Sequence, residues 1–239
     1  MIARTAIITG GARGLGLAVA TALQAEGYGL LLVDRDASVE ATAEKLAADG
    51  AVAACVADIT DPRQVQTVRA AAKALGGVDA LVNNAGITRD ARLARMTPEQ
   101  FSAVITVNLV GPMLLTSALT KELHGGASIV NMSSRAALGN FGQANYSASK
   151  SGLVGYTRGL AIAWSPRVRV NAVAPGLIDS AMTRAMPAEV LDGLVAKVPL
   201  ARIGTPEDVA RAVAFLCSPS AAFITGQVLT VCGGRSIAP

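Results

Sequence analysis

The sequence TGGARGLG, residues 9–16, joins a short apolar strand to an alanine-rich helix that we expect to run to about Glu26. Gly10, Gly14 and Gly16 allow a positive φ in the turn, close approach of a ligand to the backbone, and tight packing of the helix on the strand. A pyrophosphate at the start of this helix would meet free N–H groups and the positive end of the helix dipole. The spacing is GxxxGxG rather than GxGxxG, so the motif alone also fits a tight turn that binds nothing.

Short β-branched runs alternate with alanine-rich stretches along the whole chain. The runs are apolar on both faces, which is typical of parallel strands covered by helices on each side, whereas the strands of a half-exposed sheet alternate. This pattern predicts an α/β fold of the Rossmann type, a doubly wound seven-stranded parallel sheet with helices on both faces. The predicted strands are residues 5–9, 30–33, 52–56, 80–83, 128–132, 169–173 and 228–231.

The composition predicts one globular domain over residues 1–239, because 51% of the residues are hydrophobic and 16% are charged. The three cysteines, Cys55, Cys217 and Cys232, are far apart and lack CxxC spacing, so we expect no disulfide framework, no metal site and a cytoplasmic location. The net charge of +4 comes from singly scattered Lys and Arg residues, which argues against nucleic-acid binding.

Two uncharged stretches, 101–120 and 212–234, reach the length of a membrane span. Asn108, Gly111 and Pro112 interrupt the first, and several Gly, Ser and Pro residues interrupt the second. We therefore expect buried helices and strands, and no membrane contact.

Asp34 stands at the end of the second predicted strand, 18 residues after Gly16. A carboxylate at this place can accept hydrogen bonds from both hydroxyls of an adenosine ribose, and it repels a 2′-phosphate. The alternative is a residue that only caps a helix or closes a turn.

A second motif is YSASK, residues 146–150. Tyr146 and Lys150 lie one helical turn apart on one face, and a nearby ammonium favours the phenolate, so we expect a lowered tyrosine pKa and proton transfer near neutral pH. An amphipathic helix with a packed Tyr and an exposed Lys would show the same spacing.

Other polar residues also follow strand ends. Ser133 and Ser134 follow the fifth predicted strand, NNAG at 83–86 ends the fourth, and Asn108 lies inside an apolar helix. Ligands of open α/β sheets bind beyond the carboxyl ends of the strands, so these residues are expected to converge on one crevice.

The motifs TGGARGLG, NNAG, Asn108, YSASK and the dipeptide PG at 175–176 resemble those of the short-chain dehydrogenase/reductase family, in order and spacing, over essentially the whole chain. The resemblance implies that Tyr146 is the catalytic acid/base and that Lys150 holds the nicotinamide ribose. It also implies that Asn108 anchors a water in the proton relay and that a serine holds the substrate oxygen. The implied cofactor-binding residues are Thr9, Gly10, Arg13, Gly14, Leu15, Gly16, Asp34, Asp58, Ile59, Asn84, Ala85, Gly86, Tyr146, Lys150, Pro175, Gly176, Ile178 and Ser180.

The catalytic serine requires a choice between two neighbours. Counting back thirteen residues from Tyr146 gives Ser133, whereas matching the strand SIVNMSS to the family's strand gives Ser134. We favour Ser134 because a buried strand holds its register while loops absorb deletions.

Within the family, residues 83–90, 139–150 and 175–186 look closest to the 3-oxoacyl thioester reductases. Asp34 is instead typical of members that use NAD, so we expect NAD(H) to be preferred, with NADP(H) possible. In residues 161–168 we find no match for the basic residues with which those reductases bind acyl carrier protein.

The sequence thus predicts an oxidoreductase acting on CH–OH groups, with a 3-hydroxyacyl/3-oxoacyl thioester as substrate, carried by acyl carrier protein or CoA. An NAD-dependent dehydrogenase of polyols, sugars or steroids would show the same residues, and a non-catalytic nucleotide sensor could keep the glycines. The segment 177–203 is expected to form a substrate lid. The apolar 101–120 helix and the helix after Tyr146 are expected to pair in a homotetramer.

Overall fold

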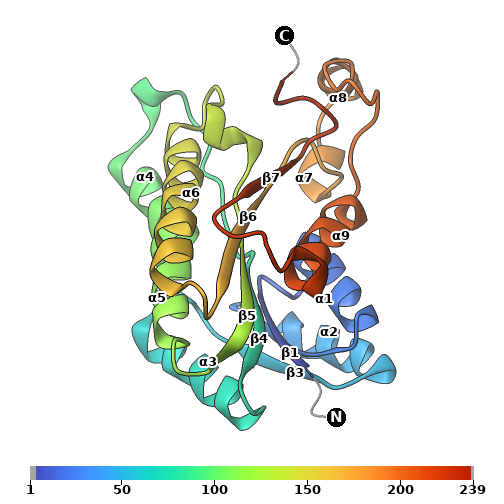
Figure 1. The fold of residues 1–239 in the computed structure, drawn as a ribbon. Coiled ribbons are helices and arrows are strands. Elements are labelled where there is room, and N and C mark those ends of the chain that lie inside the picture. Colours follow the sequence, from blue (N-terminus) through green and yellow to red (C-terminus); the bar gives the residue numbers. More distant parts are fainter. Residues whose placement is uncertain (1–3, 238–239) are drawn as a thin grey trace.

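Seven parallel strands form one sheet in the order β3-β2-β1-β4-β5-β6-β7, and helices cover both of its faces (Figure 1). The computed structural model describes residues 4–237. The predicted fold class is confirmed, and each of the seven predicted runs falls within a strand. The strands are β1 Arg4–Thr9, β2 Tyr28–Asp34, β3 Val52–Val56, β4 Val78–Asn83, β5 Leu123–Met132, β6 Arg169–Pro175 and β7 Val228–Val231. The helices are α1 Gly14–Ala25, α2 Ser38–Leu46, α3 Pro62–Ala74, α4 Pro98–Ile105, α5 Gly111–Ala118, α6 Ala144–Trp164, α7 Ala181–Arg184, α8 Ala188–Val195 and α9 Pro206–Cys217.

The core consists of two layers, one on each face of the sheet. Successive strand residues point to opposite faces, so Ile8 packs into the layer that contains residues of α1, α2 and α9, while Ile7 packs into the layer that contains residues of α3, α5 and α6. Both isoleucines are fully buried. The apolar-on-both-faces pattern therefore follows directly from coverage of the sheet on two sides.

The apolar stretch predicted as one helix over 101–120 is interrupted in the structure. α4 and α5 are joined by a π-helical turn over Thr106–Val110, and Asn108 lies fully buried inside that turn. The combined run Pro98–Ala118 is the one helical segment within the described residues that is long and apolar enough, by length and composition, to cross a membrane. The second uncharged stretch divides between α9, a short 3-10 turn and β7.

A hairpin-like excursion separates β6 from α9. Gly204 donates its N–H to the carbonyl of Leu177 (3.0 Å) and accepts from the N–H of Asp179 (2.8 Å), which joins the two ends of the excursion. α7 and α8 lie between these ends, beyond the carboxyl ends of the strands (Figure 1). The segment predicted as a lid therefore stands over the edge of the sheet at which ligands of this fold bind.

Candidate active site

The glycine-rich turn joins β1 to α1 in the conformation that its sequence predicts. Gly10 and Gly14 have φ values of +66° and +57°. A Cβ on Gly16 would lie only 2.0 Å from the carbonyl oxygen of Gly10, so no larger residue fits there. Arg13, the N-cap residue of α1, makes no side-chain cap hydrogen bond in the described chain, and the N–H groups of the first turn are therefore free to bind an anion.

Thr9 and Asn84 fasten the carboxyl ends of β1 and β4 together. The Thr9 hydroxyl accepts from the N–H groups of Asn84 and Ala85, both at 3.0 Å, and the Asn84 amide donates to the Thr9 carbonyl at 2.9 Å. A Cβ on Gly10 would meet the same Asn84 amide at 2.9 Å. The two strand ends consequently hold the turn in one position.

A cleft of about 270 Å³ opens between these strand ends and those of β2 and β3. It brings together nine of the predicted cofactor-binding residues, Thr9, Gly10, Arg13, Asp34, Asp58, Ile59, Asn84, Ala85 and Gly86. The remaining lining residues are Val33, Arg35, Ala57, Ile87 and Val107. Of these, Val33, Ala57, Ile87 and Val107 were missed by sequence reasoning. Val33 and Ala57 lie at the ends of β2 and β3, so the rule that ligands bind beyond strand ends could have found them.

Asp34, the last residue of β2, joins the glycine-rich turn to the turn before α2. Its carboxylate accepts from the N–H of Ala12 (3.2 Å) and from the N–H of Asp36 (3.1 Å). Arg13, one of the expected cofactor-binding residues, lies 3.4 Å from the carboxylate of Asp36. Arg13 and Arg35 both line the cleft, and Asp36 pairs with the first of these two arginines.

Asn108 uses its side chain to hold the segment after β4. Its Oδ1 accepts from the N–H of Ile87 (2.8 Å), and its Nδ2 donates to the carbonyl of Ile87 (3.0 Å) and to the hydroxyl of Ser149 (3.2 Å). The π-helical turn positions this amide, and such turns are frequent at functional sites. Ser149 was missed as a site residue, although it lies inside the YSASK motif.

Tyr146 and Lys150 lie on the first turns of α6, with the Lys150 Nζ 5.6 Å from the centre of the Tyr146 ring. The Nζ donates to the carbonyl of Met132 at 2.7 Å, and a Cβ on Gly86 would lie 3.5 Å from it. Lys150 thus reaches from α6 to the Gly86 edge of the cleft. Its burial lowers the pKa of Lys150 to about 8.

The expected lowering of the Tyr146 pKa is wrong for this structure. Burial raises the pKa of Tyr146 above its usual value, a hydrogen bond with the Ser134 side chain lowers it, and the charge of Asp90 raises it further. Burial dominates because the phenolate would lose more solvation than its neighbours restore.

The two candidate serines point to different places. The Ser133 hydroxyl is buried and donates to the carbonyl of Lys150 at 3.1 Å. Ser134 accepts from the N–H of Ala136 and is the serine whose side chain is hydrogen-bonded with Tyr146. The structure therefore brings Ser134, not Ser133, to the tyrosine hydroxyl.

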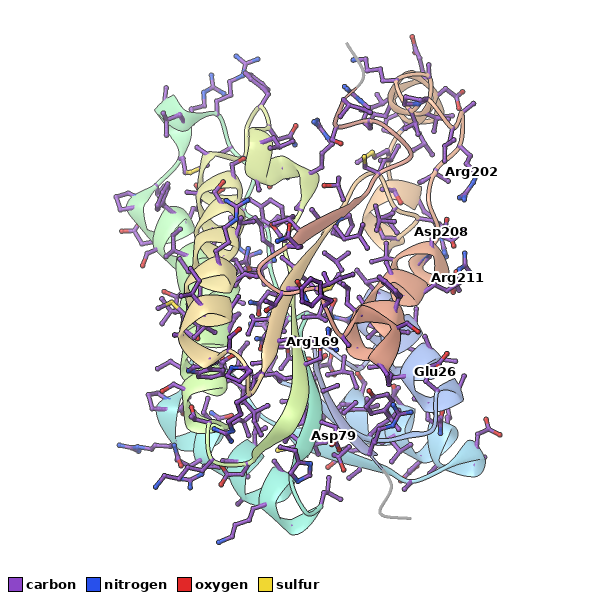
Figure 2. The ribbon with its side chains drawn as sticks, in the orientation of Figure 1. Glu26, Asp79, Arg169, Arg202, Asp208 and Arg211 are labelled. Carbon is purple, nitrogen blue, oxygen red and sulfur yellow. The ribbon has the colours of Figure 1, made fainter. Side chains whose placement is uncertain are left out.

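Other predicted residues lie outside the cleft. Gly14, Leu15 and Gly16 form the first turn of α1, and Pro175 ends β6. The Ser180 hydroxyl accepts from the N–H of Thr183 and caps α7. Ile178 lies in a second cavity of about 230 Å³, which Cys232 also lines. Arg202, just before α9, and Asp208 and Arg211, in the first turns of α9, line it as well (Figure 2).

Gly176 packs directly against Cys232, since a Cβ on Gly176 would lie 2.6 Å from the cysteine Cβ. No group of three or more His, Cys, Asp or Glu side chains that could hold a metal ion occurs within residues 4–237.

Comparison with known proteins decides the family. Residues 10–236 match the family model described as enoyl-(acyl carrier protein) reductase. An uncharacterized oxidoreductase of Mycobacterium bovis is 47% identical over 98% of both chains. The chain belongs to the short-chain dehydrogenase/reductase family. It is an oxidoreductase of that family, whose members generally use NAD(P)(H), act on small-molecule substrates and are often tetramers.

Two further relatives carry more specific names. The acetoacetyl-CoA reductase of Rhizobium meliloti is 40% identical and is matched over 99% of this chain and 100% of its own. The 3-oxoacyl-(acyl-carrier-protein) reductase of Escherichia coli is also 40% identical, with 97% and 96% of the two chains covered.

Among solved structures, a short-chain dehydrogenase/reductase of Brucella melitensis, named a glucose/ribitol dehydrogenase, superposes with a TM-score of 0.91 at 34% identity. That match covers 98% of this chain and 97% of the other.

Proposed function

We propose that this short-chain dehydrogenase/reductase interconverts a secondary alcohol and a ketone with NAD(H), and that its substrate is a 3-hydroxyacyl/3-oxoacyl thioester. The proposal is supported above all by Lys150, whose Nζ lies next to Gly86 at the edge of the cleft that contains Asp34 and 5.6 Å from the centre of the Tyr146 ring. A proton donor and a cofactor-sized groove thus lie beside each other, as alcohol–ketone chemistry requires.

In this proposal Tyr146 transfers a proton to or from the substrate oxygen. The raised pKa of its phenol keeps the proton on the side chain at neutral pH, which suits an acid in the direction of ketone reduction. The Ser134 hydroxyl, next to the phenol, holds the same oxygen. Lys150 holds the cofactor ribose, and Asn108 fixes the backbone at Ile87 and anchors a relay water. A bound nicotinamide would supply or accept the hydride.

The cofactor groove fits a dinucleotide with two free ribose hydroxyls. The uncapped first turn of α1, over Gly14, Leu15 and Gly16, suits the pyrophosphate, and Asp58 and Ile59 suit the adenine side. Asp34 would accept from the ribose hydroxyls, while Pro175, Gly176, Ile178 and Ser180 would flank the nicotinamide amide. NAD(H) is preferred because a 2′-phosphate would stand against the carboxylates of Asp34 and Asp36.

The thioester substrate is supported by the names of the relatives that cover this whole chain, an acetoacetyl-CoA reductase and a 3-oxoacyl-(acyl-carrier-protein) reductase. A second candidate is a polyol or sugar dehydrogenase, which the similarity to the glucose/ribitol dehydrogenase of Brucella melitensis favours. A nucleotide sensor without turnover has less support, because Tyr146 and Lys150 are both present and adjacent.

The test compares initial rates with acetoacetyl-CoA and NADH against a panel of polyols, sugars and steroids with NAD⁺. We expect acetoacetyl-CoA to give the highest kcat/KM. A higher kcat/KM for a polyol or sugar would favour the second candidate function over thioester reduction. No turnover with any of these substrates would favour the non-catalytic nucleotide sensor.

The assembly and location belong to the same proposal. Phe101, Val110 and Met113 expose apolar surface along α4 and α5, and we expect these helices and α6 to bury it in a homotetramer. Light scattering at micromolar protein should give the tetramer mass, and a monomer mass would contradict it. The three free, buried cysteines suit a reducing cytoplasm.

A further inference from the structure

The segments 88–96 and 135–142 form a rim at one side of the Tyr146 site. Ala91 donates its N–H to the carbonyl of Gly142 (2.9 Å), Gln143 donates to Asp90 (2.8 Å), and Asn145 donates to the carbonyl of Arg89 (2.9 Å). These bonds fix the first segment to the residues that immediately precede Tyr146. We call residues 88–96 and 135–142 the arginine rim.

The rim holds most of the protein's excess positive charge. It contains four arginines, Arg89, Arg92, Arg95 and Arg135, and one acid, Asp90, so its net charge is +3, whereas the whole chain has +4. Among residues 4–237, none of these four guanidinium groups lies within ion-pair distance of a carboxylate. Arg89, Arg92 and Arg95 are already close together in the sequence, and the fold brings their segment against Phe141.

The same rim exposes large apolar side chains. Phe141 is 84% exposed, Leu138 72% and Leu93 70%. The guanidinium of Arg92 lies over the Phe141 ring, 5.8 Å from its centre. An exposed aromatic ring beside the Arg92 guanidinium, on a segment that carries two more unpaired arginines, has the chemistry that binds a phosphorylated nucleoside, because the ring stacks a base and arginines bind phosphate.

We infer that the arginine rim binds the 3′-phosphoadenosine diphosphate part of a CoA thioester, so that CoA carries the acyl group. The inference rests on the proposed function. Phe141 stacks the adenine, Arg92 and Arg95 bind phosphate groups, and the pantetheine arm runs from the rim to Tyr146. CoA combines a base, a phosphomonoester and a diphosphate, and the rim offers an aromatic ring for the base and arginines for the phosphates. An acyl carrier protein would present an extended acidic surface, which could bind the arginines but would not stack on the Phe141 ring.

The first experiment compares two substrates that differ only in the nucleotide, acetoacetyl-CoA and acetoacetyl-pantetheine, both with NADH. Arg92→Ala and Arg95→Ala should each lower kcat/KM for acetoacetyl-CoA by about tenfold, mainly through KM, because each removes a charge-assisted bond to phosphate. Turnover of acetoacetyl-pantetheine should stay within about twofold. Lys73→Ala is the charge-matched control, since it removes one cation from the last turn of α3, and it should change neither substrate.

A second variant separates base stacking from apolar packing. Phe141→Leu keeps an apolar side chain but removes the aromatic face, and it should lower kcat/KM for acetoacetyl-CoA by about fivefold while sparing the truncated thioester. Raising the ionic strength should increase the wild-type KM for acetoacetyl-CoA and leave that of acetoacetyl-pantetheine unchanged.

The outcomes separate this inference from the function on which it rests. Equal effects on both thioesters, or none on either, would overturn the rim as a nucleotide site while leaving the reductase activity in place. Loss with acetoacetyl-acyl carrier protein but not with acetoacetyl-CoA would also overturn it and assign the rim to an acidic carrier protein. If wild type reduces neither thioester, the proposed function fails, and the rim is then tested by calorimetry with adenosine 3′,5′-bisphosphate in excess NAD⁺. Binding that is weakened by Arg92→Ala would support the arginine rim as a nucleotide site. No binding to wild type would refute it.

Discussion

At the amino ends of the strands, charged side chains join neighbouring strands and helices to one another, whereas at the carboxyl ends polar side chains surround a cleft. Asp79 near the start of β4 accepts from the N–H of Thr5 (2.8 Å) and lies 3.0 Å from His124, and Arg69 lies 2.9 Å from Glu122. Asp79 lies at the lower end of the sheet in Figure 2, far from the lid segment at the upper end. These contacts join β1, α3, β4 and β5.

The carboxyl ends use polar groups to hold backbone around an opening. Thr9, Asn84 and Asn108 bind main-chain groups, and the Lys150 Nζ stands next to Gly86 at the edge of the cleft. The comparison indicates that the amino ends of the strands contribute contacts that stabilise the fold, whereas the carboxyl ends carry the residues of the proposed reaction. Substitutions at the carboxyl ends should therefore mainly change kcat or kcat/KM, and substitutions at the amino ends should mainly change the free energy of unfolding.

The largest effect should come from Tyr146→Phe, which removes the exchangeable proton. We expect kcat to fall about 100-fold or more, with NADH affinity nearly intact, because general acid/base catalysis supplies at least that much. Stopped-flow or steady-state rates and fluorescence titration with NADH measure the two quantities.

The matched control at the other end is Asp79→Asn. It should lower the free energy of unfolding by about 1 kcal/mol or more, since it weakens the bonds to Thr5 and His124, and leave kcat unchanged. If the kcat of Tyr146→Phe stayed within a few-fold of wild type, Tyr146 would not be the catalytic acid/base, and the functional contrast between the two ends of the sheet would not hold.

The next largest effect should distinguish the two serines. Ser134→Ala removes the hydroxyl that is hydrogen-bonded with Tyr146, and it should lower kcat about tenfold or more. Ser133→Ala removes a bond to the carbonyl of Lys150 and should lower stability by about 1 kcal/mol, with a smaller loss of kcat. A larger loss of kcat for Ser133→Ala would show that the strand-register argument is wrong.

The strands could be predicted because each is buried on both faces, and a strand buried on both faces requires a run of consecutive apolar residues. Their starts were less accurate. β5 begins at Leu123 rather than near residue 128. His124, Gly125 and Gly126 are not typical of a strand, and the register of this part of β5 with β4 shifts between Val78 and Ala80. β2 likewise begins at Tyr28, before a glycine that breaks the pattern.

The site was less predictable where tertiary contacts decide it. Motif spacing predicted Tyr146, Lys150 and Asp34 as site residues, but it gave no sign of the π-helical turn that brings Asn108 to Ile87. The pKa of Tyr146 was predicted in the wrong direction, because spacing along a helix reports the neighbouring charge and not the loss of water around the phenol.

Cofactor preference should change by a smaller factor. We expect wild-type kcat/KM to favour NADH over NADPH by at least about tenfold, equivalent to roughly 1.4 kcal/mol. Asp34→Ser should narrow or invert this ratio by removing the repulsion of a 2′-phosphate. Asp36→Ser is the matched variant two residues on, and it should narrow the ratio less, by releasing Arg13. A wild type that prefers NADPH, or an unchanged ratio in Asp34→Ser, would end the assignment of Asp34 as cofactor selector.

The smallest effect concerns the pH dependence of stability at the amino ends. The hydrogen bond to Asp79 raises the pKa of His124 above its usual 6.5, and the contact with the carbonyl of Gly76 adds to the rise. A raised pKa means that the folded protein binds this proton more tightly than the unfolded chain does. The stabilisation is therefore complete below about pH 6.5 and is lost as the pH rises through the higher folded value.

His124→Gln tests this titration because it removes the ionisable ring. The His124 side chain is 44% exposed, so solvent screens the pair and the effect should be about 1 kcal/mol or less. Urea unfolding of wild type and variant at pH 5.5 and pH 9 isolates the one titration, since the other groups contribute equally to both proteins. The stability difference should be larger at pH 5.5, while kcat at either pH stays the same. A difference that grows toward pH 9 would mean that the neutral imidazole is the stabilising form, and a changed kcat would mean that the two ends of the sheet are coupled.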